Sequence, residues 1–268
     1  RSRIGEERFR REHECEFLIF DETLINSITL ADMEGVPPVE STGQVRWFKR
    51  PTPGMTYLVS LDPSMGTGGD YAAIQVFELP TFEQVGEWHH NMTPMNQQVR
   101  ILQGINKHIH DTIIEKDSSA SPQIFYSMEN NTIGEAALMR VMDIGEENIV
   151  GMFLSEPIRK GHRRKFRRGF NTTAKHKIDA CTKFKELIES GKMKINSQLL
   201  ISEMKDFVAT GLSYKAKPGQ HDDLVSSCLL MTRMMKVLAD FDPKIFEKWT
   251  DRSSEMTTPM PIFGNFYG

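Results

Sequence analysis

The sequence has few cysteines, no long apolar run and almost no net charge, and each of these features narrows the possibilities. Only three cysteines occur in 268 residues. Cys15, Cys181 and Cys228 are far apart and form no CxxC or Cys/His spacing, so we expect reduced, buried thiols rather than a disulfide framework or a zinc site. No apolar run approaches the roughly 20 residues of a membrane span, and the first residues contain no apolar signal-peptide core. We therefore expect a soluble, non-secreted protein.

The net charge of −3 conceals a separation of charge along the chain. Residues 155–185 contain eleven Lys or Arg and two acidic residues, so the rest of the chain is acidic. Lys and Arg clusters gain affinity for polyanions because they release counterions from phosphates. A solvated surface loop would also explain an isolated basic run. The hydrophobic fraction of 39% is sufficient for a core, which excludes disorder for most of the chain.

Prolines mark a predicted boundary near residue 50. The prolines of this region are Pro37, Pro38, Pro51 and Pro53. They cannot donate backbone hydrogen bonds, and turn-forming residues surround them, so we expect an extended linker here. Residues 1–50 would then be a short N-terminal part, and residues 51–268 a main domain that ends in a tail. The chain begins with Arg rather than Met, so we expect a piece of a longer protein.

From residue 56 onward, apolar periodicity predicts a regular alternation of strands and helices. The expected strands are 56–62, 70–79, 83–90, 122–130 and 147–154, and the expected helices are 95–112, 131–143, 174–190 and 224–239. Three strands in close succession favour an antiparallel meander, and the later strands should run parallel through helical crossovers. This order is typical of an α/β fold of the ribonuclease H-like (RuvC/integrase) type, a mixed sheet flanked by helices.

Carboxylates end two apolar strands and begin a buried helix. Strand alternation places Asp62 at the carboxyl end of its strand and Glu129 at the end of another. Asp222 and Asp223 begin the last predicted helix. An Asx turn or helix caps would explain each acid separately. In a ribonuclease H-like sheet, however, these three elements converge at one end, so we expect the acids to lie together.

Clustered carboxylates repel one another unless a cation neutralises them, and hard oxygen ligands suit Mg²⁺ or Mn²⁺. Two such ions would support metal-assisted phosphodiester hydrolysis, with these acids as catalytic and metal-binding residues. Spacing alone does not decide between Asp222 and Asp223, and we favour Asp223. His221 would either assist as a general acid or fix the turn, with the second role favoured. His89 and His90 are expected at the surface rather than as ligands.

The loop SMGTGG following Asp62 resembles a phosphate cradle only weakly. It does not fit the pattern GxxxxGK[ST], and no such lysine motif occurs in the chain. We expect the loop to turn the first hairpin close to the acids, with Asp70 starting the next strand. No ATPase activity is expected from this chain alone.

The run IRKGHRRKFRR contains seven Lys or Arg and no acid. Beside a metal-dependent nuclease site, contact with a nucleic-acid backbone is its favoured function, and such contacts bind without reading sequence. The predicted DNA-binding residues are Arg159, Lys160, Arg163, Arg164, Lys165, Arg167, Arg168, Lys175 and Lys177.

Three segments together resemble the nuclease motifs of the large terminase subunit of T-even-like tailed bacteriophages: LVSLDPSMGTGGDYAAIQV, IFYSMENNTIGEA and GQHDDLVSSCLL. The stretches FRREHECEF and DETLI are similar to the end of that family's ATPase domain. The resemblance implies that residues 1–50 are a remnant of the ATPase domain, and that Asp62, Glu129 and one of Asp222/Asp223 are the metal-binding catalytic acids. It also implies a portal protein and a small terminase subunit as partners, and a place in the host cell cytoplasm.

The functional hypothesis is therefore a Mg²⁺- or Mn²⁺-dependent endonuclease that cuts concatemeric double-stranded viral DNA during packaging into the prohead, with little sequence preference. A Holliday-junction resolvase or transposase-like nuclease would use the same fold. A non-catalytic DNA-docking module of a packaging motor is the alternative from another class of protein.

Overall fold

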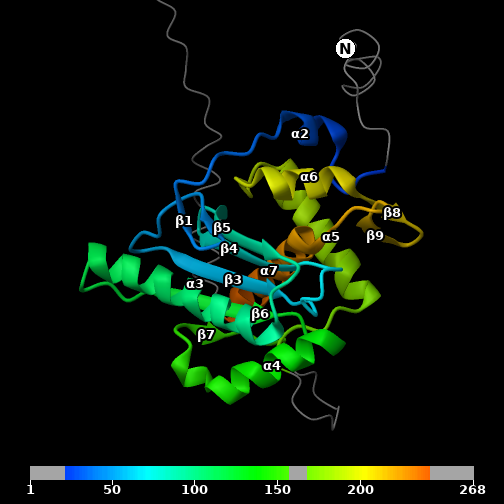
Figure 1. Ribbon diagram of the computed structural model, residues 1–268. Coiled ribbons are helices and arrows are strands. Elements are labelled where there is room, and N and C mark those ends of the chain that lie inside the picture. Colours follow the sequence, from blue (N-terminus) through cyan, green and yellow to red (C-terminus); the bar gives the residue numbers. More distant parts are fainter. Residues whose placement is uncertain (1–21, 157–167, 242–268) are drawn as a thin grey trace, which may run out of the picture.

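The computed structural model describes residues 22–156 and 168–241 (Figure 1). Its centre is a seven-stranded sheet with the order β1-β2-β5-β4-β3-β6-β7. The strands predicted at residues 70–79, 122–130 and 147–154 are shorter in the structure than expected, but the type of each element is as predicted. Within the described ranges, none of the helices combines the length and apolar character needed to cross a membrane.

The sheet is mixed, as the order of elements predicts. Strands β3 (Thr56–Asp62), β4 (Ala72–Leu79) and β5 (Glu83–His90) form an antiparallel meander. Strand β6 (Gln123–Met128) runs parallel to β3, and β7 (Met152–Phe153) runs parallel to β6. The predicted α/β sheet, in which an antiparallel meander of three strands is followed by parallel strands as in a ribonuclease H-like fold, is therefore confirmed.

Helices cover both faces of this sheet. Helices α3 (Met95–Lys116) and α4 (Thr132–Ile144) share a core with Tyr57, Val59 and Leu61. Leu58 faces the other way, into a core with α5 (Ala174–Glu189), α6 (Gln198–Asp206) and α7 (Asp223–Phe241). The helices α4 and α6 accordingly lie on opposite sides of the sheet in Figure 1. Alternation along β3 thus directs its even-numbered residues toward α7.

The stretch expected as extended linker is partly a β-hairpin. Strands β1 (Glu40–Thr42) and β2 (Val45–Trp47) pair with each other, and β2 also pairs with β5. Trp47 drives this docking, because its buried ring lies against Gly86 and stacks on His108 with ring centroids 4.5 Å apart. Before the hairpin, Leu30 in the short helix α2 (Ser27–Asp32) is buried in the core formed with α5, α6 and α7. The assignment of residues 1–50 to a preceding domain stays a prediction.

Residues 198–216 hold elements that periodicity did not predict. Helix α6 is followed by a separate two-stranded sheet of β8 (Phe207–Thr210) and β9 (Ser213–Ala216). A 3₁₀ turn, Glu146–Asn148, occupies the start of the strand expected over 147–154, and strand β7 covers only two residues of that stretch. Cys181 and Cys228 are free and buried, as expected, whereas Cys15 lies outside the described residues.

Candidate active site

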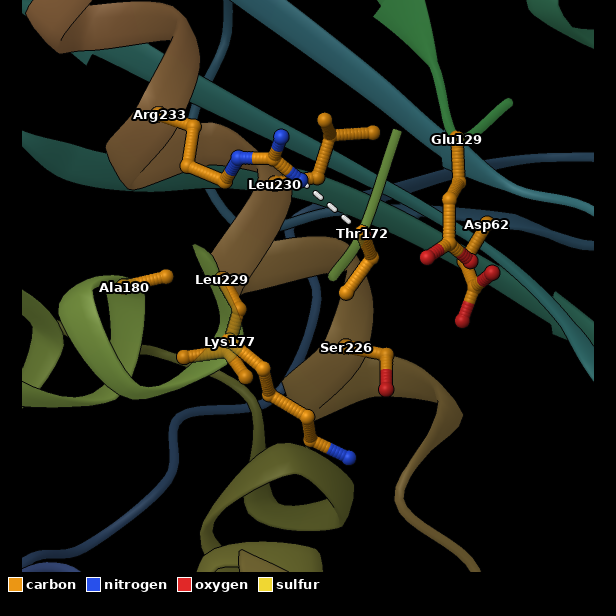
Figure 2. Close-up of a pocket in the computed structure, with 9 residues that line it drawn as sticks. All are labelled: Asp62, Glu129, Thr172, Lys177, Ala180, Ser226, Leu229, Leu230 and Arg233. Carbon is orange, nitrogen blue, oxygen red and sulfur yellow. Dashed lines mark hydrogen bonds between the residues drawn. The ribbon is translucent and has the colours of Figure 1, made fainter. Parts of the chain in front are cut away.

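Two of the predicted acids meet at the carboxyl ends of neighbouring parallel strands. Leu61 of β3 is in register with Met128 of β6, and the backbone N–H of Glu129 donates to the carbonyl of Leu61 at 3.1 Å. Asp62 and Glu129 therefore follow at the same edge of the sheet. Figure 2 shows their side chains together on one side of a cavity of about 160 Å³. The structure thus brings together two carboxylates that are 67 positions apart in the chain.

Burial and mutual repulsion dominate the electrostatics of this pair. The pKa of Asp62 is raised well above its usual range, first because the group is buried, then because the Glu129 carboxylate faces it, and then because of Asp223. Asp222 adds a smaller contribution of the same sign. An ionised carboxylate in such a place needs a positive charge nearby, since burial and like charges both favour its neutral form.

Both aspartates at the start of α7 lie near the pair, but they have different partners. Asp222 accepts from the backbone N–H of Ala216 at 3.3 Å and lies 3.9 Å from the Lys177 ammonium. Asp223 accepts from the backbone N–H of Tyr71 at 3.4 Å and lies 3.6 Å from His221 Nδ1. Burial and the neighbouring Asp222 charge raise the pKa of Asp223 to about 6. Among the described residues, Asp222 has a lysine ammonium nearby, whereas the charged neighbour of Asp223 is the His221 ring.

The donor chemistry fits a hard divalent cation, although the ligand set is incomplete. Carboxylate oxygens are the usual ligands of Mg²⁺ and Mn²⁺, and a cation would relieve the repulsion between Asp62 and Glu129. Within the described ranges, however, no three His, Cys, Asp or Glu side chains form a group that could hold a metal ion. The pair supplies two carboxylates, and Asp223 and Asp222 at the start of α7 are near enough to raise the pKa of Asp62 further.

The predicted histidines have different environments. His221 is exposed and meets the Tyr71 ring edge-on at 4.8 Å between centroids. His89 stacks on Tyr71 at 4.1 Å and is only 13% exposed, so its expected surface position is wrong. Burial, followed by the charge of Arg46, lowers the pKa of His89 to about 4. His90 is half-buried, with Nδ1 2.7 Å from the hydroxyl of Thr93, rather than at the surface as expected.

The basic residues divide into three groups. Lys177 lines the cavity, and Lys175 is exposed two residues earlier on α5. Arg168 forms an ion pair with Glu146, which reduces its availability for a ligand. The remaining predicted DNA-binding residues lie outside the described residues: Arg159, Lys160, Arg163, Arg164, Lys165 and Arg167.

Sequence reasoning missed several residues around the acids. Ser226 and Arg233 line the cavity from α7, and Thr172 lines it from the segment before α5. The spacing of seven between Ser226 and Arg233 puts them on one helix face, a signal that was available in the sequence. Glu203 of α6 carried no such signal, because its side chain accepts from the backbone N–H of Val225 only through the fold. Burial raises the pKa of Glu203 to about 9.

The glycine-rich loop after β3 turns close to the following helix rather than forming an open cradle. Gly66 has φ of +67°, and a Cβ there would lie 2.1 Å from the carbonyl oxygen of Thr93. Both the conformation and the contact therefore require glycine. The Gln98 side-chain amide at the start of α3 donates to the carbonyls of Ser64 and Thr93, at 2.8 and 2.7 Å. This fixes the loop beside the acidic end of the sheet.

Gly134 allows α4 to begin directly against the strand end that holds Glu129. A Cβ at position 134 would lie 1.8 Å from the carbonyl oxygen of Glu129. We expect Gly134→Ala to lower the free energy of unfolding by about 1–3 kcal/mol, because the helix or the strand end must move. Urea denaturation followed by circular dichroism measures this change.

Gly104 of α3 provides the matched control, because it is exposed and a Cβ there would meet nothing within 4 Å. We expect Gly104→Ala to raise the free energy of unfolding by about 0.5–1 kcal/mol through helix propensity. Equal stability of the two variants would contradict the close contact between Gly134 and Glu129.

Solved nuclease domains of large terminases share this fold. The nuclease of the large terminase from thermophilic phage G20c, with bound magnesium, superimposes with a TM-score of 0.57 at 18% identity, covering 79% of this chain and 96% of that chain. The Thermus phage P74-26 large terminase nuclease domain matches with a TM-score of 0.53 at 18% identity, covering 75% of this chain and 90% of that chain. A human cytomegalovirus terminase nuclease domain, soaked with Mn and with inhibitor bound, matches with a TM-score of 0.50 at 13% identity, covering 79% of this chain and 94% of that chain.

These identities establish a shared fold. Family membership follows from the sequence itself, because residues 59–234, more than half of the chain, match the model of one family. That match spans β3, β6 and α7, the three elements that carry the acids. The chain belongs to the family described as the terminase RNaseH-like domain.

Proposed function

We propose that this chain is a divalent-metal-dependent endodeoxyribonuclease that cuts double-stranded DNA. The observation that carries the proposal is the meeting of Asp62 and Glu129 in one cavity, at the carboxyl ends of β3 and β6 and beside the start of α7. The family and the metal-bound nuclease structures of similar fold support it. The coarser assignment, a terminase nuclease-type domain, rests on the family match alone.

In this proposal Asp62 and Glu129 would hold the metal, and Asp223 would complete the ligand set, with Asp222 as the second choice. One or two Mg²⁺ or Mn²⁺ ions would activate water and stabilise the departing oxygen of a phosphodiester. The chain itself keeps two carboxylates close together in a partly enclosed cavity, where a cation has the largest effect. The Lys177 ammonium and the Ser226 hydroxyl, which also line the cavity, would orient a phosphate. His221 stays a possible assistant to Asp223, because its Nδ1 is 3.6 Å away.

Lys177 and Lys175 would extend a DNA-binding surface from the cavity along α5. The basic run over 159–168 would continue this surface, and its contacts would be to phosphates, which explains the expected lack of sequence preference. Arg168 is the weakest of these candidates, because Glu146 already neutralises it.

The biological role that we propose is cutting of concatemeric viral DNA during packaging into the prohead, in the cytoplasm of the host cell. Similarity to large terminase nuclease domains supports this role. A T-even-like origin, a preceding ATPase domain in the same full-length chain, and docking to a portal protein and a small terminase subunit belong to the same proposal.

Plasmid cutting tests the proposed function. Supercoiled plasmid should be nicked and linearised with Mg²⁺ or Mn²⁺, and EDTA should abolish the reaction because the carboxylates alone cannot activate water. Agarose-gel electrophoresis measures both products. Preference for a four-way junction over linear duplex would favour a resolvase-like nuclease instead. DNA binding without cutting under either metal would overturn the nuclease assignment and favour a docking module.

A further inference from the structure

Of the two cationic side chains that line the cavity among the described residues, Lys177 and Arg233, Arg233 has the larger set of protein partners. It lies on α7, three turns beyond Asp223, and its side chain is only 11% exposed. Its guanidinium donates to the hydroxyl of Thr172 at 2.9 Å and to the carbonyl of Asn171 at 2.9 Å, and it forms an ion pair with Glu156. The Phe170 ring lies under it, with 5.2 Å between the guanidinium carbon and the ring centroid.

These partners come from two separate stretches of chain. Glu156 follows β7, whereas Phe170, Asn171 and Thr172 precede α5. The two stretches also bond to each other, because the Glu156 carboxylate accepts from the backbone N–H of Asn171 at 3.4 Å and its own N–H donates to Gly169 at 3.2 Å. Arg233 therefore fastens both stretches to α7 through one planar group.

The second stretch is paired with the strand end that holds Glu129. The N–H of Asn130 donates to the carbonyl of Phe170 at 2.7 Å, and the N–H of Phe170 donates to Met128 at 3.2 Å. The Asn130 side chain adds a bond to the carbonyl of Arg168 at 2.7 Å. Phe170 thus lies beside Glu129 as a short parallel bridge. A displacement of Phe170 would shift the backbone on both sides of Glu129.

Arg233 shares the cavity with the acids, but its donors are directed to protein acceptors. Figure 2 shows its guanidinium on the far side of Thr172 from Asp62 and Glu129, with a hydrogen bond to Thr172. The Glu156 carboxylate neutralises its charge. Lys177 differs, because its ammonium lies 3.9 Å from Asp222 and 5.5 Å from the centroid of the Phe207 ring and, among the described residues, donates no hydrogen bond as short as those of Arg233. Arg233 is therefore built to hold the chain rather than to bind a phosphate.

We propose that Arg233 is a positioning residue for the metal-binding carboxylates: with Glu156 it fixes residues 170–172 against the end of β6, and so sets the place of Glu129 relative to Asp62. Only the expected effect of Arg233 on DNA cutting rests on the proposed function. Its effect on metal affinity is independent of whether the chain cuts DNA.

The decisive variants are Arg233→Gln and Glu156→Gln in the full 268-residue chain. Each should weaken Mn²⁺ affinity in isothermal titration calorimetry about 10- to 100-fold, the usual loss when a group that orients a metal ligand is removed. Arg233→Lys should restore part of the affinity, because it keeps the charge and loses the planar fork. The double variant should lose no more than Arg233→Gln alone, since both residues act as one unit.

Three further measurements separate positioning from other roles. Cutting by Arg233→Gln should require more Mn²⁺ and recover at high Mn²⁺, whereas partial unfolding would lower the rate at every concentration. The affinity of Arg233→Gln for duplex DNA in EDTA, measured by fluorescence anisotropy, should stay within about twofold of that of the unaltered chain. Arg140→Gln is the matched control, because Arg140 forms an exposed pair with Asp143 on α4 and should change none of these quantities.

Two results would overturn the proposal. If Arg233→Gln weakens DNA binding and its salt dependence while Mn²⁺ affinity is unchanged, Arg233 contacts phosphate directly. If Arg233→Lys and Glu156→Gln both fold and both bind Mn²⁺ like the unaltered chain, Arg233 has no positioning role. A chain that binds Mn²⁺ but does not cut plasmid would refute the proposed function and leave the calorimetric test of Arg233 intact.

Discussion

Asp62→Asn should abolish plasmid cutting, with a loss of about 10³-fold or more, and leave the fold and DNA binding intact. Asp62 lies at the point where burial and the charges of Glu129 and Asp223 act together. An amide keeps the size of the side chain but removes the negative charge that a divalent cation needs, and metal ions supply several kcal/mol of transition-state stabilisation. Initial rates of plasmid nicking with Mn²⁺ measure the loss.

The same substitution should have the opposite effect on stability without metal. In EDTA, Asp62→Asn should raise the melting temperature, because the neutral amide removes the repulsion that raises the pKa of Asp62. Addition of Mn²⁺ should stabilise the unaltered chain and not the variant, since only a bound ion shifts the folding equilibrium. Asp143→Asn is the control, because Asp143 is 62% exposed on α4. Full cutting activity in Asp62→Asn would refute the site.

Asp223→Asn should reduce cutting about a hundredfold or more, whereas Asp222→Asn should stay within about tenfold of the unaltered chain. Asp223 has the larger influence on the pKa of Asp62, and its own pKa is raised to about 6 by burial and by Asp222. Asp222 is instead held by the Ala216 N–H and lies near Lys177. Asp223 is therefore the better third ligand.

The two variants form a matched pair, because each removes one negative charge and the two positions are adjacent at the start of α7. Single-turnover cutting and Mn²⁺ affinity should fall together in Asp223→Asn. In Asp222→Asn, Lys177 loses its acidic neighbour, so duplex-DNA affinity should stay the same or increase. A larger loss of Mn²⁺ affinity in Asp222→Asn than in Asp223→Asn would reverse the assignment.

Much of the fold was predictable because its signals are local. The alternation of Tyr57, Val59 and Leu61 against Leu58 follows from the two-residue period of a strand, and both faces are buried in separate cores. Elements that depend on distant partners were not predictable. The β1–β2 hairpin looked like linker because its pairing with β5 depends on Trp47 reaching Gly86, a contact that no local pattern contains.

The same division holds for the candidate site. The sequence by itself determined that Asp62 and Glu129 end two apolar strands and that two aspartates begin a buried helix, because side-chain direction in regular elements follows from position. Only the tertiary structure decided that Asp222 lies beside Lys177 and that Arg233 joins Glu156 to residues 170–172. These contacts cross between separate elements, and their geometry depends on how the helices pack on the sheet rather than on any spacing along the chain.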